Sequence, residues 1–206
     1  MHRISRQLLR KNCLLSLAVY LGSWMIGIAL ALKFIPQQMI AHIDIHPTQQ
    51  DAWLYISHNL ELELLFLAGA LTLGVAPVLL LVWNGCLDGI LATAVARHYG
   101  LQVVLVGLLP HGIPEALAWI LLGTCSLLLS RYLRTLFFPG KKTPAVMESE
   151  PIAHDASLTG WRAIWHRLPW QLTNVYSCFI IGSALLIILA GILEATVSPW
   201  LMHTLG

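Results

Sequence analysis

The sequence has few charged residues. Only 11% of its 206 residues are Asp, Glu, Lys or Arg, whereas 57% are hydrophobic. Soluble domains carry roughly a quarter charged residues, so a soluble chain of this length could not cover so much apolar surface. The net charge of +2 is also too small to indicate a nucleic-acid partner. The scarcity of charge therefore predicts a protein whose main partner is the lipid bilayer.

Familiar catalytic signatures are missing as well. The sequence contains no Walker A sequence, no GxSxG elbow and no HExxH pair. Its four cysteines lie scattered in apolar segments without a CxxC pair, which favours small buried side chains over redox or metal chemistry. These absences exclude an ATPase built into this chain.

Long apolar runs, in contrast, are abundant. Four of them reach the length of about 20 residues that a membrane-spanning helix needs, and we expect helices at 13–32, 59–83, 113–133 and 173–197. The segment 84–112 is harder to assign, because its apolar run is short and stops at a proline. We therefore predict an all-α fold, a polytopic transmembrane helix bundle with four clear helices plus a broken or re-entrant segment. If that segment crosses, the single membrane domain has about five crossings.

The basic residues predict the orientation of the bundle. They precede the first helix at positions 3–11 and follow the helix 113–133, but none lies in 36–57. The positive-inside rule then places the N-terminus in the cytoplasm and 36–57 outside a cell (inner) membrane. It also places 140–172 in the cytoplasm. Within that loop, the Trp-rich stretch 161–167 is typical of an interfacial amphipathic helix.

A histidine and a carboxylate stand at the predicted start of a membrane helix. His111 and Glu115 follow Pro110 and are four residues apart, which puts them on one side of the first helical turn. Glu194 lies near the far end of the last helix, and if the segment 84–112 crosses the membrane, that end faces outward like the His111 end, so that the three side chains can converge. Charged groups at membrane depth are costly and usually face protein or a polar cavity. Capping and packing, substrate or ion handling, and metal binding all remain open for this group.

Other polar residues flank these segments. Asn84–Gly85 is a turn or helix C-cap signal that opens the broken segment. Asp88 follows it, and we expect this carboxylate to cap a helix or to pair with Arg97. Glu61 and Glu63 lie near the outer end of the helix 59–83, where we expect solvent to reach them.

The same residues carry a family resemblance. Asn84–Gly85, then Gly89, then His111-Gly112-Ile113-Pro114-Glu115 opening the next helix, resemble the stage II sporulation protein M family. Asn59 at the start of the second helix and the 194–199 end of the last helix are similar too. The resemblance spans roughly residues 59–199. The Trp-rich approach to the last helix and the long polar loop before residue 59 depart from it.

The resemblance implies a multi-helix membrane protein without a defined reaction. Founding members act with other sporulation proteins in septal membrane remodelling and engulfment. Other relatives belong to clusters that make circular bacteriocins, where they resemble export, maturation or immunity components. A separate ATPase or a cell-envelope protein is therefore an expected partner.

Three functions remain open from the sequence. The first is a non-ATPase scaffold or transport/export-associated subunit that works without a cofactor. Its small helical residues favour tight association, including a homodimer. Its expected sites for substrate or ion handling are His111, Glu115, Glu194, Asn84, Asn59 and Asp88.

The second function is an intramembrane metal-dependent hydrolase. In that case His111, Glu115 and Glu194 hold a metal ion that activates water, and these three residues are the catalytic candidates. The third is a structural or immunity membrane protein whose polar motif only locks the fold.

Overall fold

The computed structural model describes residues 6–36, 52–137 and 170–200, and these residues form helices with no β-strand among them. The long helices are α1 (Arg6–Phe34), α3 (Ala52–Gly69), α4 (Val75–Tyr99), α6 (Leu109–Phe137) and α8 (Trp170–Ala195). Four stretches are long and apolar enough to cross a membrane, namely 6–34, 75–99, 101–134 and 174–200. The prediction of an all-α, polytopic helix bundle is confirmed.

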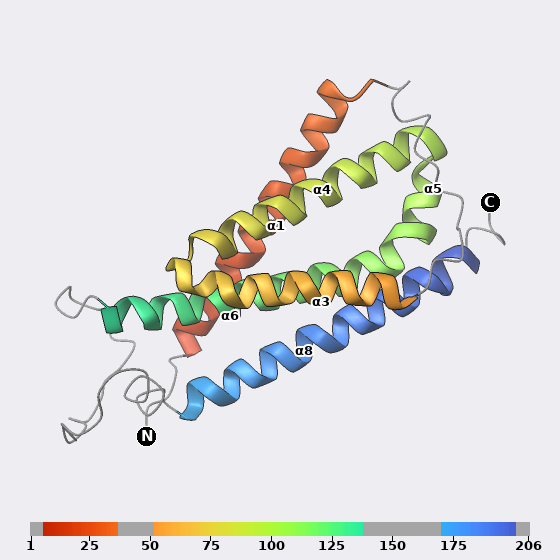
Figure 1. The fold of residues 1–206 in the computed structure, drawn as a ribbon. Helices are drawn as coiled ribbons and strands as arrows, with labels where there is room; N and C mark the ends of the chain where they lie inside the picture. The colour runs from red at the N-terminus through yellow and green to blue at the C-terminus, as the bar shows by residue number, and fades with distance from the viewer. Residues whose placement is uncertain (1–5, 37–51, 138–169, 201–206) are drawn as a thin grey trace, which may run out of the picture.

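The long helices alternate in direction along the chain (Figure 1). The first, α1, leads away from the end of the bundle where the N-terminus lies, α3 returns, and α4, α6 and α8 continue the alternation. The two termini consequently lie at opposite ends. The chain thus forms five long helices, of which the stretch of α3 is not among the four long and apolar enough to cross a membrane.

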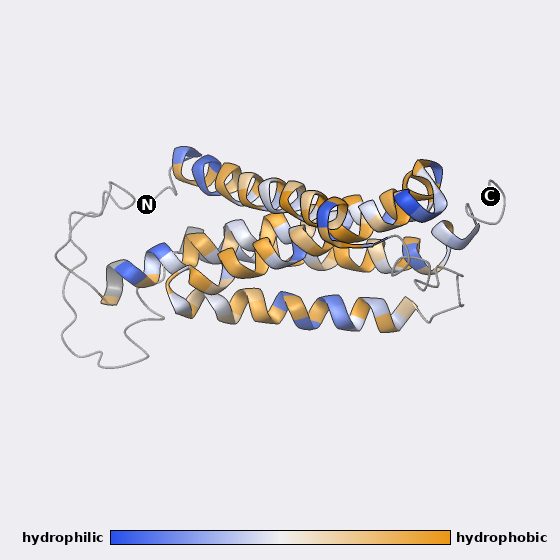
Figure 2. Ribbon diagram, turned by 90° about the horizontal axis from the view of Figure 1, so that it is seen from above, coloured by the Kyte–Doolittle hydropathy of each residue, from blue (hydrophilic) through white to orange (hydrophobic). Residues whose placement is uncertain are grey.

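Hydrophobic side chains cover the outside of the bundle, and many polar ones lie inside. Large exposed apolar residues occur on every long helix, for example Leu21, Leu79 and Leu185. Hydropathy colouring shows long apolar stretches along the helices and hydrophilic residues at the starting end of α1 and the finishing end of α6 (Figure 2). Such an apolar exterior suits a lipid environment and would favour aggregation in water.

The expected continuous helix 59–83 is wrong. The chain reverses in its middle, where η1 (Ala70–Thr72) is followed by Leu73 and Gly74 with φ of 56° and 100°. A glycine adopts such a left-handed conformation without steric cost, so Gly74 permits the turn. Pro77 falls in the first turn of α4, where its missing N–H costs no helical hydrogen bond. One predicted helix is thus a hairpin of two.

The expected turn at Asn84–Gly85 is also wrong, because both residues are buried inside α4. The break in the segment 84–112 lies at Gly100, which has φ of 92°. After it come α5 (Leu101–Val103) and a π-helical turn, η2 (Val104–Leu108), which runs directly into α6. The helix therefore does not begin at residue 112 or 113. Pro110 has no N–H group to donate to the helix. The widened π-turn just before it accommodates this gap in the helical hydrogen-bond pattern.

Close approach of α1 and α4, the most extensive helix pair, depends on glycine. A Cβ atom at Gly89 would collide with the backbone carbonyl of Trp24, and one at Gly27 would collide with the carbonyl of Cys86. A Cβ atom at Gly85 would collide with the Ser23 hydroxyl and with the Tyr20 carbonyl. Small residues at helix crossings allow backbones to approach in this way. The glycines of the Asn84–Gly89 motif therefore serve packing.

Parts of two predicted loops lie outside the described residues. For the loop 36–57, residues 37–51 are not described, and residues 52–57 belong to α3 rather than to a loop. For the loop 140–172, residues 140–169 are not described, and this gap includes the expected interfacial helix 161–167. Residues 170–172 begin α8.

A carboxyl cluster as the candidate functional site

Each of the five long helices contributes a polar side chain to one region of the bundle. At its centre is Glu115 of α6, which is partly buried. The charged groups that act on Glu115 are Asp88 of α4 and Glu194 of α8, and the Asn59 amide of α3 is a hydrogen-bond partner. We call Asp88, Glu115 and Glu194 the carboxyl cluster. Both charged neighbours of Glu115 are acidic, so no salt bridge offsets its charge.

A tyrosine from α1 completes this region. The buried Tyr20 hydroxyl donates a hydrogen bond to Oδ2 of Asp88. Tyr20 is also within electrostatic reach of Glu115. The contact lies beside the glycine crossing of α1 and α4, so the position of Asp88 depends on that close approach.

The expected pairing of Asp88 with Arg97 is not what the structure contains. Arg97 Nη1 instead donates hydrogen bonds to the carbonyl oxygens of Ala31 and Ile35, at 3.1 and 2.8 Å. The Ile35 carbonyl lies just beyond the end of α1, where helical partners run out, whereas the Ala31 carbonyl also accepts a hydrogen bond from the Ile35 N–H. Arg97 therefore caps the end of α1, and the side-chain hydrogen bond to Asp88 comes from Tyr20.

His111 makes its hydrogen bond away from the carboxyl cluster. Its Nδ1 atom lies 3.0 Å from the hydroxyl oxygen of buried Ser198, which follows the end of α8. His111 and Glu115 share a side of α6, as the sequence predicted, but their contacts diverge. The prediction that a new helix starts at residue 112 or 113 is wrong, because α5 and η2 extend the helical backbone back to Leu101, while His111 lies in the first turn of α6 itself.

Asn59 and Asn84 have different surroundings, although both were expected at the site. Asn59 is buried and is a partner of Glu115. The Asn84 amide donates instead to the Leu80 carbonyl of its own helix, at 2.8 Å. The hydrogen bond of the Asn84 amide therefore stays within α4 and does not go to the carboxyl cluster.

An aromatic pair forms the apolar wall beside Glu115. Trp119 is fully buried one turn along α6, and its ring stacks on Phe66 of α3 with centroids 5.7 Å apart. Its indole nitrogen approaches the Glu115 carboxyl without completing a hydrogen bond. Indole and phenyl rings lower the local polarity, which strengthens electrostatic interactions among the carboxyls.

Among the described residues, no three His, Cys, Asp or Glu side chains are gathered tightly enough to hold a metal ion. His111, Glu115 and Glu194 were the expected ligands. The described residues do not bring these three together as a ligand set, and His111 Nδ1 lies 3.0 Å from the Ser198 hydroxyl instead. What the arrangement offers is acidic oxygens with neutral hydrogen-bond donors around them.

Sequence reasoning missed a buried carboxylate outside the carboxyl cluster. Glu63 is only 4% exposed, and the Ser183 hydroxyl of α8 donates to its Oε1 atom at 2.8 Å, while Oε2 has no hydrogen-bond partner. The expectation that solvent reaches Glu63 is therefore wrong, whereas Glu61 is exposed as expected. The missed signal is spacing, because Asn59, Glu63 and Phe66 recur on one helical face.

Tyr20 was missed for a related reason. Buried residues of α1 recur every three or four positions, and all of them are polar or small apart from Tyr20: Asn12, Ser16, Tyr20, Ser23, Gly27 and Ala31. In a lipid-facing helix, such a stripe marks the face that packs against protein. Reading α1 for this stripe would have placed Tyr20 inside.

Comparison with known proteins gives one result. The model of the family described as stage II sporulation protein M matches residues 12–199, which is most of the chain and includes all three members of the carboxyl cluster. No curated protein and no solved structure matches the chain significantly.

Proposed function

Because the chain belongs to the stage II sporulation protein M family, we propose that it is a non-ATPase membrane subunit, a scaffold or transport-associated component of a larger complex. Within that role, the carboxyl cluster takes up and releases a proton. Two observations support this proposal: the hydrogen bond from Tyr20 to Asp88, and the electrostatic influence of Asp88, Glu194 and Asn59 on Glu115, which together involve five different helices.

Electrostatics explains why a proton is the expected occupant. Glu115 has two carboxyl neighbours, and three ionised groups would repel one another strongly in a medium of low polarity. The Tyr20 hydroxyl and the Asn59 amide donate hydrogen bonds but supply no positive charge. Taking up a proton removes part of the surplus negative charge at once. Ionisable groups with this arrangement inside membrane bundles commonly serve proton relays.

The role as a subunit rests on what the chain has and lacks. Its described helices form an apolar bundle, and the sequence has no nucleotide-binding motif to drive work by itself. A separate ATPase or cell-envelope protein would supply that drive, and a second copy of the chain is a further partner. The N-terminus is cytoplasmic in this proposal, because basic residues lie at that end.

A purely structural role is the second candidate, and two contacts favour it. The Tyr20–Asp88 and His111–Ser198 hydrogen bonds tie α1 to α4 and α6 to the end of α8. Buried polar contacts of this kind can specify one packing arrangement without taking part in chemistry.

Glu115→Gln separates the two candidates, with Glu61→Gln as the matched control. Both changes replace one carboxyl by an amide of the same size, but Glu61 is exposed on α3. Purified protein would be followed by infrared difference spectroscopy during pH steps, which reports protonated carboxylic acids. We expect Glu115→Gln to stay folded and to lose part of the titrating carboxyl signal. Glu61→Gln should keep the part of the signal that comes from the carboxyl cluster.

Two other results would count against the proposal. A folded Glu115→Gln protein with the full wild-type carboxyl signal would show that the cluster binds no proton through Glu115. Selective unfolding of Glu115→Gln would favour the structural role. The subunit claim is tested separately by chemical cross-linking in native membranes, where we expect assemblies larger than one chain and where monomer alone would contradict it.

A further inference from the structure

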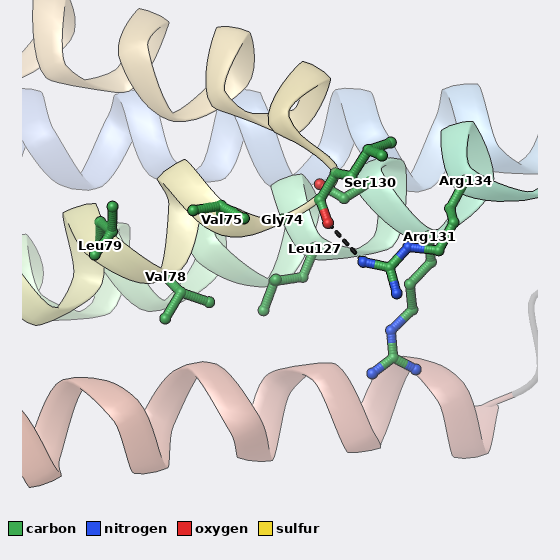
Figure 3. Close-up of a pocket in the computed structure, with 9 residues that line it drawn as sticks. Gly74, Val75, Val78, Leu79, Leu127, Ser130, Arg131 and Arg134 are labelled. Carbon is green, nitrogen blue, oxygen red and sulfur yellow. Dashed lines mark hydrogen bonds between the residues drawn. The ribbon is translucent and has the colours of Figure 1, made fainter. Parts of the chain in front are cut away.

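A pocket lies at the end of the bundle opposite to the Gly100 break. It has a volume of about 450 Å³ and lies between the start of α4 and the last turns of α6 (Figure 3). Its lining joins apolar side chains of α4 to two arginines of α6, Arg131 and Arg134. No acidic residue is among the described residues that line it. The pocket is therefore apolar on one side and cationic on the other.

The two arginines are held differently. Arg134 Nη2 donates a hydrogen bond to the Leu73 carbonyl at 2.8 Å, which fixes its guanidinium against the turn between α3 and α4. Arg131 is partly buried and has no hydrogen bond or ion pair to any described residue. In Figure 3 its guanidinium extends from α6 toward α1. One guanidinium is thus prepositioned, and the other is available to a ligand.

The apolar side of the pocket opens to the outside of the bundle. Val75 and Leu79 are each 62% exposed, and Val78 lies between them on α4. Leu127 closes the floor from α6. A hydrocarbon chain lying against this wall would cover apolar surface on the same face that other lipids contact.

Charge at this end of the bundle points to an anion. The exposed basic residues of the start of α1, including Arg10 and Lys11, lie at the same end as the finish of α6 (Figure 2). A single guanidinium group can bind two phosphate oxygens with two parallel hydrogen bonds. Basic pockets between membrane helices near the interface are typical sites for anionic headgroups.

We propose that this pocket binds an anionic phospholipid, with its phosphate on Arg131 and Arg134 and an acyl chain along Val75, Val78 and Leu79. The site lies away from the carboxyl cluster and does not depend on the proposed proton chemistry. A bound lipid would brace the α3–α4 turn against α6, because Arg134 already joins the two.

Native mass spectrometry of the purified full chain in detergent tests the proposal. Phosphatidylglycerol and phosphatidylcholine with the same acyl chains would be titrated in parallel. We expect the wild-type protein to retain phosphatidylglycerol preferentially. Arg131→Gln should weaken phosphatidylglycerol binding by about fivefold, the effect of one arginine near an anionic headgroup. Its phosphatidylcholine binding should not change.

Arg10→Gln is the matched control, because it removes the same charge from the same end without touching the pocket. We expect it to leave phosphatidylglycerol binding within about twofold of wild type, since it makes no contact with the bound phosphate. Val78→Phe fills the pocket from α4 and keeps both arginines. It should also weaken phosphatidylglycerol binding, and it provides the decisive variant if Arg131→Gln fails to fold.

Three results would overturn the lipid assignment. If a folded Arg131→Gln protein binds phosphatidylglycerol as tightly as the wild-type protein, the phosphate does not contact Arg131. Equal losses in Arg10→Gln and Arg131→Gln would indicate diffuse attraction to the basic surface. Inorganic phosphate that binds as tightly as phosphatidylglycerol would indicate an ion site to which the apolar wall contributes nothing.

Discussion

Replacing Gly89 by alanine should separate the two helices that position Asp88. A methyl group at this site would meet the backbone carbonyl of Trp24, and a backbone atom cannot move aside as a flexible side chain can. The helices α1 and α4 must therefore move apart along their crossing. Forced overpacking of this kind costs about 1–3 kcal/mol of folding free energy.

The same separation would lengthen the Tyr20–Asp88 hydrogen bond, which lies one turn from the crossing. A hydrogen bond to a charged group contributes about 1.5–3 kcal/mol. If only part of it is lost, we expect Gly89→Ala to lower the unfolding free energy by about 2–4 kcal/mol in total.

Denaturant-induced unfolding in detergent micelles would measure this change. Gly22→Ala is the control on α1, because a Cβ atom there meets nothing within 4 Å. It should change stability by no more than about 1 kcal/mol, in the direction of the higher helix propensity of alanine. A Gly89→Ala protein as stable as wild type, or equal losses in both variants, would refute the packing explanation.

Three further changes have defined outcomes. Arg97→Gln removes the hydrogen bonds to the Ala31 and Ile35 carbonyls and should loosen the end of α1. Amide hydrogen exchange should then become faster at that end, while exchange in the middle of α1 stays as in the wild-type protein. Unchanged exchange at the end of α1 would exclude capping. Ser183→Ala should destabilise the bundle by about 1–3 kcal/mol in the same unfolding assay, because both Glu63 oxygens would then lack a partner. Ser198→Ala should make the His111 ring more mobile in nuclear magnetic resonance spectra, because the ring would keep only its hydrogen bond to the Gly107 backbone; an unchanged ring signal would contradict the Ser198 contact.

Composition and long apolar runs were enough to predict the helix bundle and the alternating passes. They were not enough to place the turns. The segment 59–83 reads as one helix because hydropathy does not fall at Leu73–Gly74, and only the left-handed backbone of these two residues reverses the chain. Conversely, Asn84–Gly85 looks like a turn in sequence, but its glycine is required by the α1 backbone that packs against it.

The candidate site was partly predictable for a similar reason. Glu115 and Glu194 could be grouped from the expected ends of their helices, and Asn59 from its place in a family motif. The separation of His111 from them could not, because it depends on Ser198 beyond the last helix. The π-turn before α6 also rotates the helix face in a way that a period of 3.6 residues does not anticipate.

A double-mutant cycle of Glu115→Gln and Glu194→Gln tests the existence of the carboxyl cluster most directly. The infrared signal of protonated carboxyls would be followed against pH in the wild-type protein, both single variants and the double variant. We expect strong non-additivity, with each substitution moving the titration midpoint of the remaining carboxyl toward that of an isolated group. Additive changes, with each carboxyl titrating as if the other were absent, would contradict a functional cluster.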